Sequence, residues 1–434
     1  MRFCAEMIES PPAAGAKGVL FACVQDITAH SSAQPTRKRN WLRERAILQS
    51  NPDRRPAPRD MPSDSQILAT LQQAAQEVGL EVRATTPVEA LRAEVRTRIR
   101  QWMHEGRAGE MDYLAAAAPL LEDPRAWKDW AQSMVLVALP YAREAGSFRG
   151  GGRVARYALG RDYHNLIGKR LERLGKRLRA AGLVDRFRAC TDAAPLAERE
   201  WAIQAHTGWR GKNTLLLDPD FGPWVLLGEL LVDAPLPDYR KPVRRWASCG
   251  SCTRCLDICP TGALDAAWSL DARLCLSYLT IELRGAIPHE LRPALGEWVF
   301  GCDLCLEVCP FGDHAGEHDA EWGRLPALDE LRLEDLLGLD EARFAAHFQG
   351  SPLRRPGRAG LARNACVALG NLGRGEAELS LALEQDPAAL VRGHAAWALG
   401  RLDARAALEA AWAKEQDAEV RDEIDRALAE ARGG

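Results

Sequence analysis

The 434-residue sequence contains no run of about 18 or more apolar residues, so it offers no candidate transmembrane helix. Its N-terminus lacks a basic region followed by a long apolar core, because Glu6 and Glu9 precede a short apolar patch. Neither charge sign dominates, since 57 Lys and Arg residues face 60 Asp and Glu residues, for a net charge of −3. We therefore expect a cytoplasmic protein without a membrane association, in which the balanced total still leaves room for a local basic patch.

Two common nucleotide-binding motifs are also missing. No G-x-G-x-x-G follows a predicted strand and opens a helix, and Gly150-Gly151-Gly152 is a bare glycine run typical of a loop. The segment Gly211–Thr214 carries Gly-Lys but lacks both the earlier glycine and the following Ser or Thr of a P-loop. The sequence therefore gives no support for a nicotinamide, FAD or nucleoside triphosphate site of these types.

Cysteine, by contrast, is plentiful, and eight of the twelve cysteines fall within residues 246–315. The first run has the spacing C-x2-C-x2-C-x3-C-P that is typical of bacterial ferredoxins, and a second run repeats its last part. One cysteine between the runs can supply the missing member. The eight are Cys249, Cys252, Cys255, Cys259, Cys275, Cys302, Cys305 and Cys309.

The spacing predicts how these cysteines divide between two [4Fe-4S] clusters. Two residues between thiolates let consecutive sulfurs bind one cluster, whereas three residues before Cys-Pro carry the last sulfur to the other cluster. One predicted ligand set is Cys249, Cys252, Cys255 and Cys309, and the other is Cys302, Cys305, Cys259 and Cys275. The alternative is two Cys4 zinc sites, which usually pair one C-x2-C with a distant one. Cys4, Cys23, Cys190 and Cys366 have no ligand spacing and are interpreted as ordinary thiols.

The pattern along the rest of the chain predicts several domains. Residues 134–139 read as a buried strand, Asn165–Arg179 and Ala197–Ala205 as helices, and Trp224–Leu231 as either. A helical pattern begins at Ser63-Asp64, either of which suits an N-cap, so that Met61 is a candidate start of translation. The predicted segments are a disordered extension (1–60), an α/β (α+β) domain (61–245), a ferredoxin-like two-cluster domain (246–315), a helical connector (316–352) and an all-α domain (353–434).

The last segment is repetitive. Ala-Leu pairs at 368–369, 398–399 and 427–428 recur at spacings of 30 and 29, each within a helical run. A period near 30 with two helices per unit favours stacked repeats of the HEAT type. The alternative is one helical bundle whose alanines coincide.

Several blocks of this chain resemble one known family. They are RYALGRDYHNLIGKRL (Arg156–Leu171), DAAPLAEREWA (Asp192–Ala202), GWRGKNTLLL (Gly208–Leu217), LCLSYLTIELRGAIPHELR (Leu274–Arg292), GCDLCLEVCP (Gly301–Pro310) and FQGSPLRRPGRAGLARNACVALGN (Phe348–Asn371). Together they resemble the epoxyqueuosine reductases over most of residues 64–400. The chain departs from the family's usual pattern at His206-Thr207 and at Phe311-Gly312, which puts only the local pocket shape in doubt.

The resemblance implies a cobalamin-dependent enzyme that receives electrons from an external one-electron donor. A monomer is the simpler expectation for its oligomeric state, which the sequence does not decide. Its substrate would be epoxyqueuosine at the wobble position of tRNA and its product queuosine, with cobalamin held by residues 61–245. The family match assigns Asp192 as the acid that protonates the epoxide oxygen, whereas the sequence alone also allows it to cap the helix that follows. The candidate corrin contacts are Asp162, Tyr163, His164, Gly211, Lys212, Asn213, Thr214, Ser277 and Asp303.

An arginine-rich stretch is the predicted tRNA contact. Between Ala342 and Gly375 there are six arginines and no Asp or Glu, so the local charge is +6. Guanidinium groups bind phosphates through paired, planar hydrogen bonds, although a merely solvated basic surface is the alternative. The candidate contacts are Arg354, Arg355, Arg358 and Arg363, with Trp246 as a candidate for stacking on an unpaired base.

Two other functions compete with the tRNA reductase. A reductive dehalogenase-like enzyme would use the same cofactors on a small organohalide, but would normally carry an export signal and no helical repeat. A noncatalytic electron-transfer module would leave the blocks around Asp162, Asp192 and Gly208 without a role.

Overall fold

The computed structural model describes residues 62–242, 247–312 and 320–430. The predicted extension, together with Cys4, Cys23 and Trp246, lies outside the described residues. The first helix, α3 (Asp64–Gln76), begins at Ser63 as predicted, where a capping box forms. The Ser63 hydroxyl accepts the N–H of Gln66, and the Gln66 side chain accepts the N–H of Ser63 at 2.8 Å.

A five-stranded antiparallel sheet forms the centre of residues 62–242, in the order β5-β8-β2-β1-β9. The ambiguous stretch around Trp224–Leu231 proves to be strand β8, which lies between β5 and β2. The strands are β1 (Glu81–Pro87), β2 (Ser133–Pro140), β5 (Phe187–Cys190), β8 (Val225–Val232) and β9 (Tyr239–Arg240).

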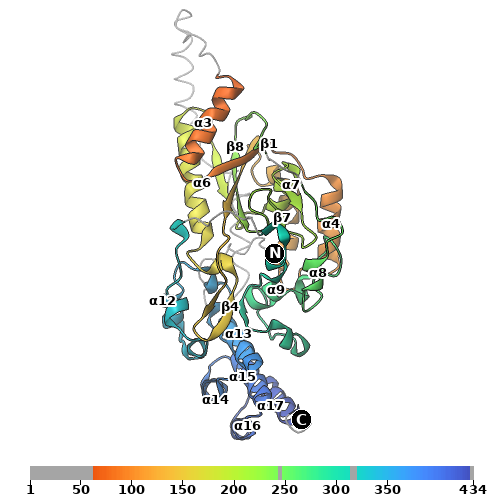
Figure 1. Cartoon of the computed structure of the whole chain (residues 1–434), viewed down its shortest axis with the longest axis vertical. Helices are drawn as coiled ribbons and strands as arrows, with labels where there is room; N and C mark the ends of the chain where they lie inside the picture. The colour runs from red at the N-terminus through yellow and green to blue at the C-terminus, as the bar shows by residue number, and fades with distance from the viewer. Residues whose placement is uncertain (1–61, 243–246, 313–319, 431–434) are drawn as a thin grey trace, which may run out of the picture.

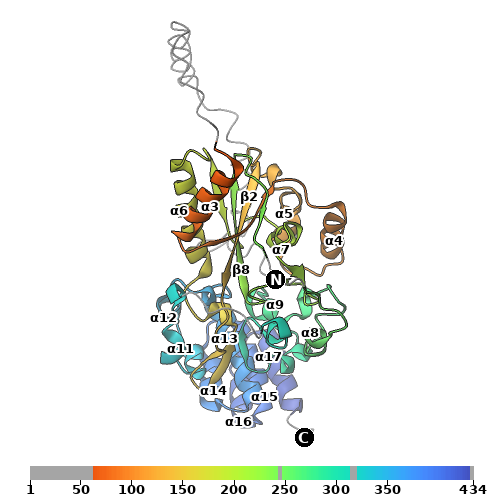
Figure 2. The same cartoon turned by 45° about the horizontal axis from the view of Figure 1, so that its top comes forward.

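Helices cover both faces of this sheet, as Figure 2 shows. Alternate side chains of β2 enter two different cores, so Val135 and Val137 pack toward α3 and α6, whereas Met134 and Leu136 pack toward α7. This explains why the strand reads as a continuous apolar run rather than an alternating one. The helices of this part are α4 (Ala93–His104), α5 (Asp112–Glu122), α6 (Tyr163–Ala180) and α7 (Glu198–Gln204).

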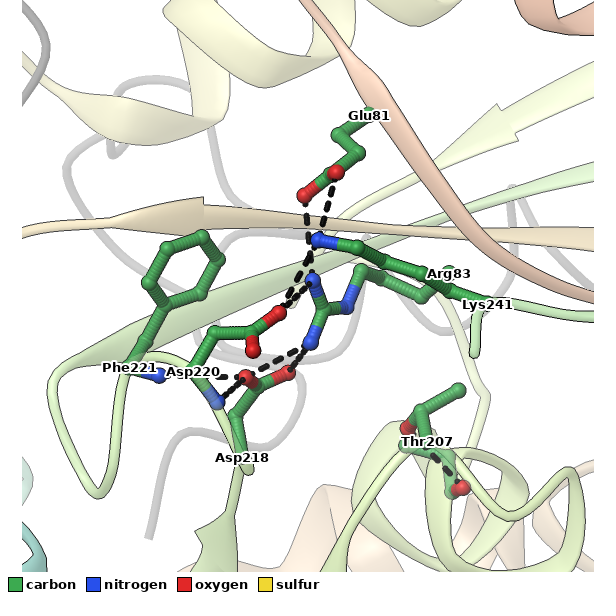
Figure 3. Close-up of polar contacts among 8 residues, drawn as sticks. Glu81, Arg83, Thr207, Asp218, Asp220, Phe221 and Lys241 are labelled. Atoms are coloured by element: carbon green, nitrogen blue, oxygen red, sulfur yellow. Dashed lines mark hydrogen bonds and ion pairs between the residues drawn. The ribbon is translucent and has the colours of Figure 1, made fainter. Parts of the chain in front are cut away.

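A buried ion pair ties the loop after β7 (Leu216–Leu217) to the sheet (Figure 3). Both oxygens of Asp218 accept hydrogen bonds from Arg83 at 2.7 Å, and Asp220 binds the same guanidinium at 2.8 Å. Nearby, the hydroxyl of Thr207 donates to the carbonyl of Ala202, which satisfies the polar residue that departs from the family pattern. These contacts fix both ends of a hairpin that reaches the candidate site.

The cysteine-rich segment joins the first domain through a small second sheet. In this sheet β10 (Trp298–Phe300) runs parallel to β4 (Gly151–Val154), which pairs with β3 (Gly146–Phe148). Two short helices, α8 (Arg254–Asp257) and α10 (Leu304–Glu307), each contain one cysteine of a run, Cys255 and Cys305, and α9 (Leu276–Ile281) follows Cys275. The segment is thus packed against the first domain.

Short helical turns link this segment to the C-terminal helices. They are η8 (Ala320–Trp322), α11 (Ala327–Glu330), η9 (Glu334–Gly338), α12 (Glu341–His347) and η10 (Pro352–Arg354). Buried apolar side chains from these turns join one core that runs from α3 to the end of the described chain. Among the described residues, each helix is too short or too polar to cross a lipid bilayer.

The C-terminal helices stack in two layers (Figure 1). Gly370 lies against α15 so closely that a methyl group there would come within 2.9 Å of Ala398, and Gly400 meets Ala427 in the same way one unit later. The repeated glycines therefore let the alternate helices approach at equivalent points. The helices are α13 (Gly357–Leu372), α14 (Glu376–Gln385), α15 (Ala389–Arg401), α16 (Arg405–Trp412) and α17 (Ala418–Glu430).

Helix α13 is fastened to the cysteine-rich segment by a buried arginine. Arg363 is 0% exposed and donates to the carbonyls of Leu279, Leu283 and Gly285 at 2.7–3.0 Å. The adjacent amide of Asn364 donates to two further carbonyls. The prediction that Arg363 contacts tRNA is therefore wrong, because its donors satisfy buried carbonyl groups inside the protein.

Candidate active site and cysteine cavities

The eight cysteines line two separate cavities. Cys249, Cys252, Cys255 and Cys309 share one cavity. Cys259, Cys275, Cys302 and Cys305 line the other. The structure thus brings the cysteines together in the two sets of four that the spacing predicts. Nowhere in the described parts do three His, Cys, Asp or Glu side chains gather tightly enough for a single metal ion.

A hairpin from the first domain reaches between these cavities. It consists of β6 (Trp209–Arg210) and β7, and its loop presents Lys212, whose ammonium donates to the carbonyls of Gly250 and Cys252 at 2.8 and 2.9 Å. The side chain of Asn213 donates to the carbonyl of Cys305 at 3.3 Å, and Asn213 lines both cavities.

The predicted corrin-binding loop is therefore divided. Gly211 and Lys212 lie in the cavity of the first cysteine set, and Lys212 uses its charge to hold the cysteine loop. Asn213 and Thr214 line the second cavity. The prediction that Gly211 and Lys212 contact the same group as Asn213 and Thr214 does not fit this arrangement.

Asp192 lies in the wall of the second cavity, which we call the Asp192 pocket. It follows β5, is 5% exposed, and accepts a hydrogen bond from the Tyr163 hydroxyl on its Oδ2 atom. Its Oδ1 atom is buried and makes no hydrogen bond. Helix α7 starts later, with Ala197 at its N-cap and no side-chain cap, so the alternative that Asp192 caps this helix is wrong.

The start of α6 supports Asp192 from behind. Asp162 caps this helix by accepting the N–H of His164 at 2.9 Å, and it also contacts Nδ1 of that ring at 2.5 Å. The His164 ring stacks on Tyr163 with centroids 3.9 Å apart, and its Nε2 lies 3.5 Å from Asp192 Oδ2. Tyr163 lines the Asp192 pocket, whereas Asp162 and His164 do not and instead hold Tyr163 and Asp192.

The rest of the pocket is mainly apolar, with two polar groups beside the cysteines. Ser277 and Asp303 line it as predicted, and Asp303 accepts the N–H of Arg156 at 2.6 Å. A further cavity lies between α4 and the segment around Leu270. It shares the lining residues Arg199, Thr214 and Leu270 with the Asp192 pocket. The two cavities therefore share part of their walls.

Comparison with known proteins identifies the family. Residues 122–193 match the family described as epoxyqueuosine reductase QueG, DUF1730, and residues 248–312 match a 4Fe-4S double cluster binding domain. The epoxyqueuosine reductase of Xanthomonas campestris is 39% identical over 351 residues, which cover 78% of this chain and 97% of that protein. This chain belongs to the epoxyqueuosine reductase family.

Solved structures of epoxyqueuosine reductases share its fold. One was crystallised with a tRNA-Tyr epoxyqueuosine-modified stem loop and has a TM-score of 0.75 at 27% identity, covering 86% of this chain and 100% of that one. Another, from Bacillus subtilis, has its catalytic aspartate loop swung out of the active site; it has a TM-score of 0.73 at 27% identity and covers 85% of this chain and all of that one. The double-cluster match supports iron-sulfur clusters over zinc for this family member.

Two carboxyl groups behind Asp192 escaped the sequence-based prediction. Burial, followed by the nearby Asp192 charge, raises the pKa of Glu198 to about 8. Burial raises the pKa of Glu229 well above its usual range, and the Glu198 charge adds to this effect. An acidic residue inside the apolar run VLLGELLV was the available sequence signal for Glu229.

The arginine-rich stretch is mostly engaged within the protein. Arg358 is buried and forms two hydrogen bonds with Asp386, at 2.7 and 2.9 Å, so the prediction that it contacts tRNA is also wrong. Arg355 is partly buried and pairs with Glu282 at 2.8 Å. Arg354 is exposed. Of the described cysteines outside the two cavities, Cys190 and Cys366 pack in the apolar cores.

Proposed function

We propose that this family member reduces epoxyqueuosine in tRNA to queuosine. In net terms two electrons and two protons remove the epoxide oxygen as water and leave an alkene in the cyclopentane ring. The observation that carries the proposal is the buried Asp192 Oδ1 atom, which has no partner and belongs to a pocket lined by four cysteines. A proton donor and an electron-transfer centre would then meet in one enclosed space.

Asp192 is the proposed acid. A carboxyl group that lines an enclosed pocket is placed to pass a proton to a bound substrate. Tyr163 holds Oδ2 and thereby leaves Oδ1 as the oxygen that carries the proton to the substrate. His164 and Asp162 keep the tyrosine ring in place. We take the Asp192 loop as the counterpart of the catalytic loop of the Bacillus subtilis relative.

Electrons would pass through two [4Fe-4S] clusters from an external one-electron donor. The cluster of Cys249, Cys252, Cys255 and Cys309 would receive them, because these cysteines share no cavity with Asp192. The other cluster would deliver them into the Asp192 pocket. Asn213, which lines both cavities, would set the separation of the two clusters.

Cobalamin is the proposed partner of the second cluster. The fit rests on the mostly apolar pocket, on the neighbouring cavity that shares part of its wall, and on the unpaired Asp192 oxygen. When bound, cobalamin supplies a strong cobalt nucleophile or reductant. The residues that would hold it are Tyr163, Asn213, Thr214, Ser277 and Asp303.

The proposed domains follow these roles. Residues 61–245 would hold cobalamin, residues 246–315 the two clusters, and residues 353–434 would form HEAT-like repeats, with residues 316–352 as the connector. The glycine contacts that recur between alternate helices support the repeat assignment. A monomer is the proposed working form.

For tRNA we propose two contacts. Arg354 and Arg355 remain the candidates for phosphate binding, since both lie near the entry to the repeats and Arg354 is exposed. Trp268 is half exposed and lines the cavity next to the Asp192 pocket, and its ring N–H donates to the carbonyl of Arg210 at 3.2 Å. An indole held in this way can stack on an unpaired base.

The deciding experiment uses the reconstituted full chain with cobalamin, a chemical reductant and tRNA that carries epoxyqueuosine. Nucleosides from the digested tRNA are then analysed by mass spectrometry. We expect loss of epoxyqueuosine and formation of queuosine, only when cobalamin is present. Turnover of an organohalide without any queuosine would instead favour the dehalogenase-like alternative, and electron transfer with neither product would favour the noncatalytic module.

A further inference from the structure

The backbone of Asp192 is held in an unusual conformation. Its φ angle is +53°, in the left-handed region that residues other than glycine rarely occupy. Its backbone N–H donates a hydrogen bond to Glu198 Oε1 on α7. Such a conformation persists only where neighbouring groups hold it. Glu198 holds the backbone of Asp192, whereas Tyr163 holds its side chain.

Glu198 is itself backed by a second carboxyl group. Glu229 on β8 stands opposite Cys190 of β5 and Leu136 of β2, and its side chain points to the face that α7 covers. It is 0% exposed, and neither of its carboxyl oxygens accepts a hydrogen bond from a protein donor. A proton on one of the two glutamates lets it hydrogen-bond the other.

The surroundings of this pair offer little compensation for negative charge. The groups that act on it are Asp192 and Cys190, which add negative charge when ionised, and His164, which favours ionisation of Glu198. Arg199, the next residue along α7, donates a hydrogen bond to the carbonyl of Thr214. Two ionised carboxylates at this place would repel each other in an apolar interior.

We propose that Glu198 and Glu229 form a proton-dependent latch that holds the Asp192 loop in its catalytic position. A proton on Glu229 lets it donate to Glu198, which in turn accepts the Asp192 N–H. Loss of the last shared proton makes both groups anionic, and their repulsion releases the loop. The inference rests on the proposed role of Asp192 as the acid.

Two observations support the latch independently of its geometry. Burial raises the pKa of Glu198 to about 8 and that of Glu229 further, so the pair keeps a proton at neutral pH. A swung-out catalytic loop exists in the Bacillus subtilis relative, so a loop of this kind has an open position. Glu229 is therefore a positioning residue, and Glu198 positions Asp192 through the backbone N–H, although Glu198 also lines the Asp192 pocket.

The test measures amide hydrogen exchange of the loop at residues 191–197 in the holoenzyme from pH 6 to 9.5, corrected for intrinsic exchange. We expect Glu198→Ala to raise exchange at neutral pH about tenfold, as expected for the loss of a hydrogen bond. In the unmodified chain, exchange should rise and kcat should fall only above about pH 8, because the last shared proton leaves Glu229, whose pKa is raised further than that of Glu198.

Glu229→Gln provides the sharper variant. Its amide still donates to Glu198 but carries no titratable proton, so the loop should stay protected and the alkaline fall in kcat should move to higher pH. Glu172→Gln, an exposed position on α6, is the matched control and should leave both profiles unchanged. Iron content and circular dichroism establish that each variant is folded.

Two results would overturn the latch: unchanged loop exchange in Glu198→Ala, or an unshifted alkaline transition in Glu229→Gln. The exchange experiment needs no substrate, so its outcome is separate from that of the proposed function. Protected loops without any queuosine formation would contradict the proposed function and leave the latch intact. Normal queuosine formation while the amides of residues 191–197 exchange rapidly in every variant would contradict the latch alone.

Discussion

Tyr163 donates its phenolic hydrogen to one carboxyl oxygen of Asp192 and thereby separates the roles of the two oxygens. Oδ2 is occupied by this hydrogen bond, whereas Oδ1 is buried without a partner in the wall of the pocket. A carboxyl group held by one oxygen can present the other in a fixed direction. In the proposed reaction, the free oxygen therefore carries the proton.

Asp192→Asn is expected to abolish most turnover while the clusters and cobalamin stay bound. An amide has the same shape but cannot donate an acidic proton, so we expect kcat to fall by about 10²–10⁴. Tyr163→Phe removes only the orienting hydrogen bond and should cost about tenfold. Single-turnover conversion of epoxyqueuosine tRNA measures both effects. Full activity in the Asn variant would rule out the acid role.

The division of the cysteines can be tested with paired substitutions. Cys249→Ala combined with Cys309→Ala removes two ligands of the same proposed cluster, so the second cluster with about four irons should remain. Cys249→Ala combined with Cys302→Ala removes one ligand from each, so both clusters should be lost. Iron analysis and electron paramagnetic resonance after anaerobic reconstitution distinguish the pairs. Equal iron loss in the two double variants would contradict the assignment.

Acid should destabilise the protein through His394. This residue is buried on α15; its Nε2 accepts the N–H of Ile287 at 3.1 Å, and its Nδ1 lies 2.7 Å from the carbonyl of Leu390. Burial and then the Arg292 charge hold the pKa of His394 well below 6.5. Below about pH 6.5 the unfolded chain therefore binds a proton at His394 that the folded chain does not bind. The free energy of unfolding is accordingly at its full value above that pH and falls below it.

The measurement is the thermal midpoint of the anaerobic holoprotein between pH 7.5 and 5. His394→Gln keeps an acceptor for Ile287 but does not titrate, so its midpoint should fall less on acidification. His104→Gln, at an exposed position on α4, is the control and should follow the unmodified chain. Identical pH dependence in the His394 variant would contradict this prediction.

The combined change Arg354→Ala and Arg355→Ala should weaken tRNA binding and flatten its salt dependence. Each lost phosphate contact lowers the slope of log affinity against log salt by about 0.7–0.9. Trp268→Ala should weaken binding without changing that slope, because base stacking releases no counterions. Arg426→Ala, an exposed change on α17, serves as the control. Binding titrations at several salt concentrations measure these effects.

The two sets of cysteines were predictable because ligand spacing is a local property of the sequence. Three residues separate Cys255 from Cys259, which precedes a proline. This spacing carries Cys259 to the other cavity. The cap at Ser63 and the central strand of the sheet were predictable for the same reason, since each depends on a short pattern.

The roles of individual polar residues were not predictable, because they depend on contacts far along the chain. Arg354 and Arg363 look alike in the sequence, yet one is exposed and the other binds carbonyls about 80 residues earlier. Lys212 likewise belongs to a polar loop, but its charge serves the backbone of the cysteine segment. Glu229 sits in an apolar strand, and only the fold brings Glu198 beside it.

The buried arginine of α13 also bears on how the protein is made. The last cysteine of the two cavities, Cys309, is synthesised 54 residues before Arg363, which secures the carbonyls of the segment between the cysteine runs. At about 5–20 residues per second, translation leaves an interval of about 3–11 seconds in which all eight thiols exist without this fastening. Iron and sulfide can therefore enter a segment that is still loose, and completion of α13 closes the scaffold around them.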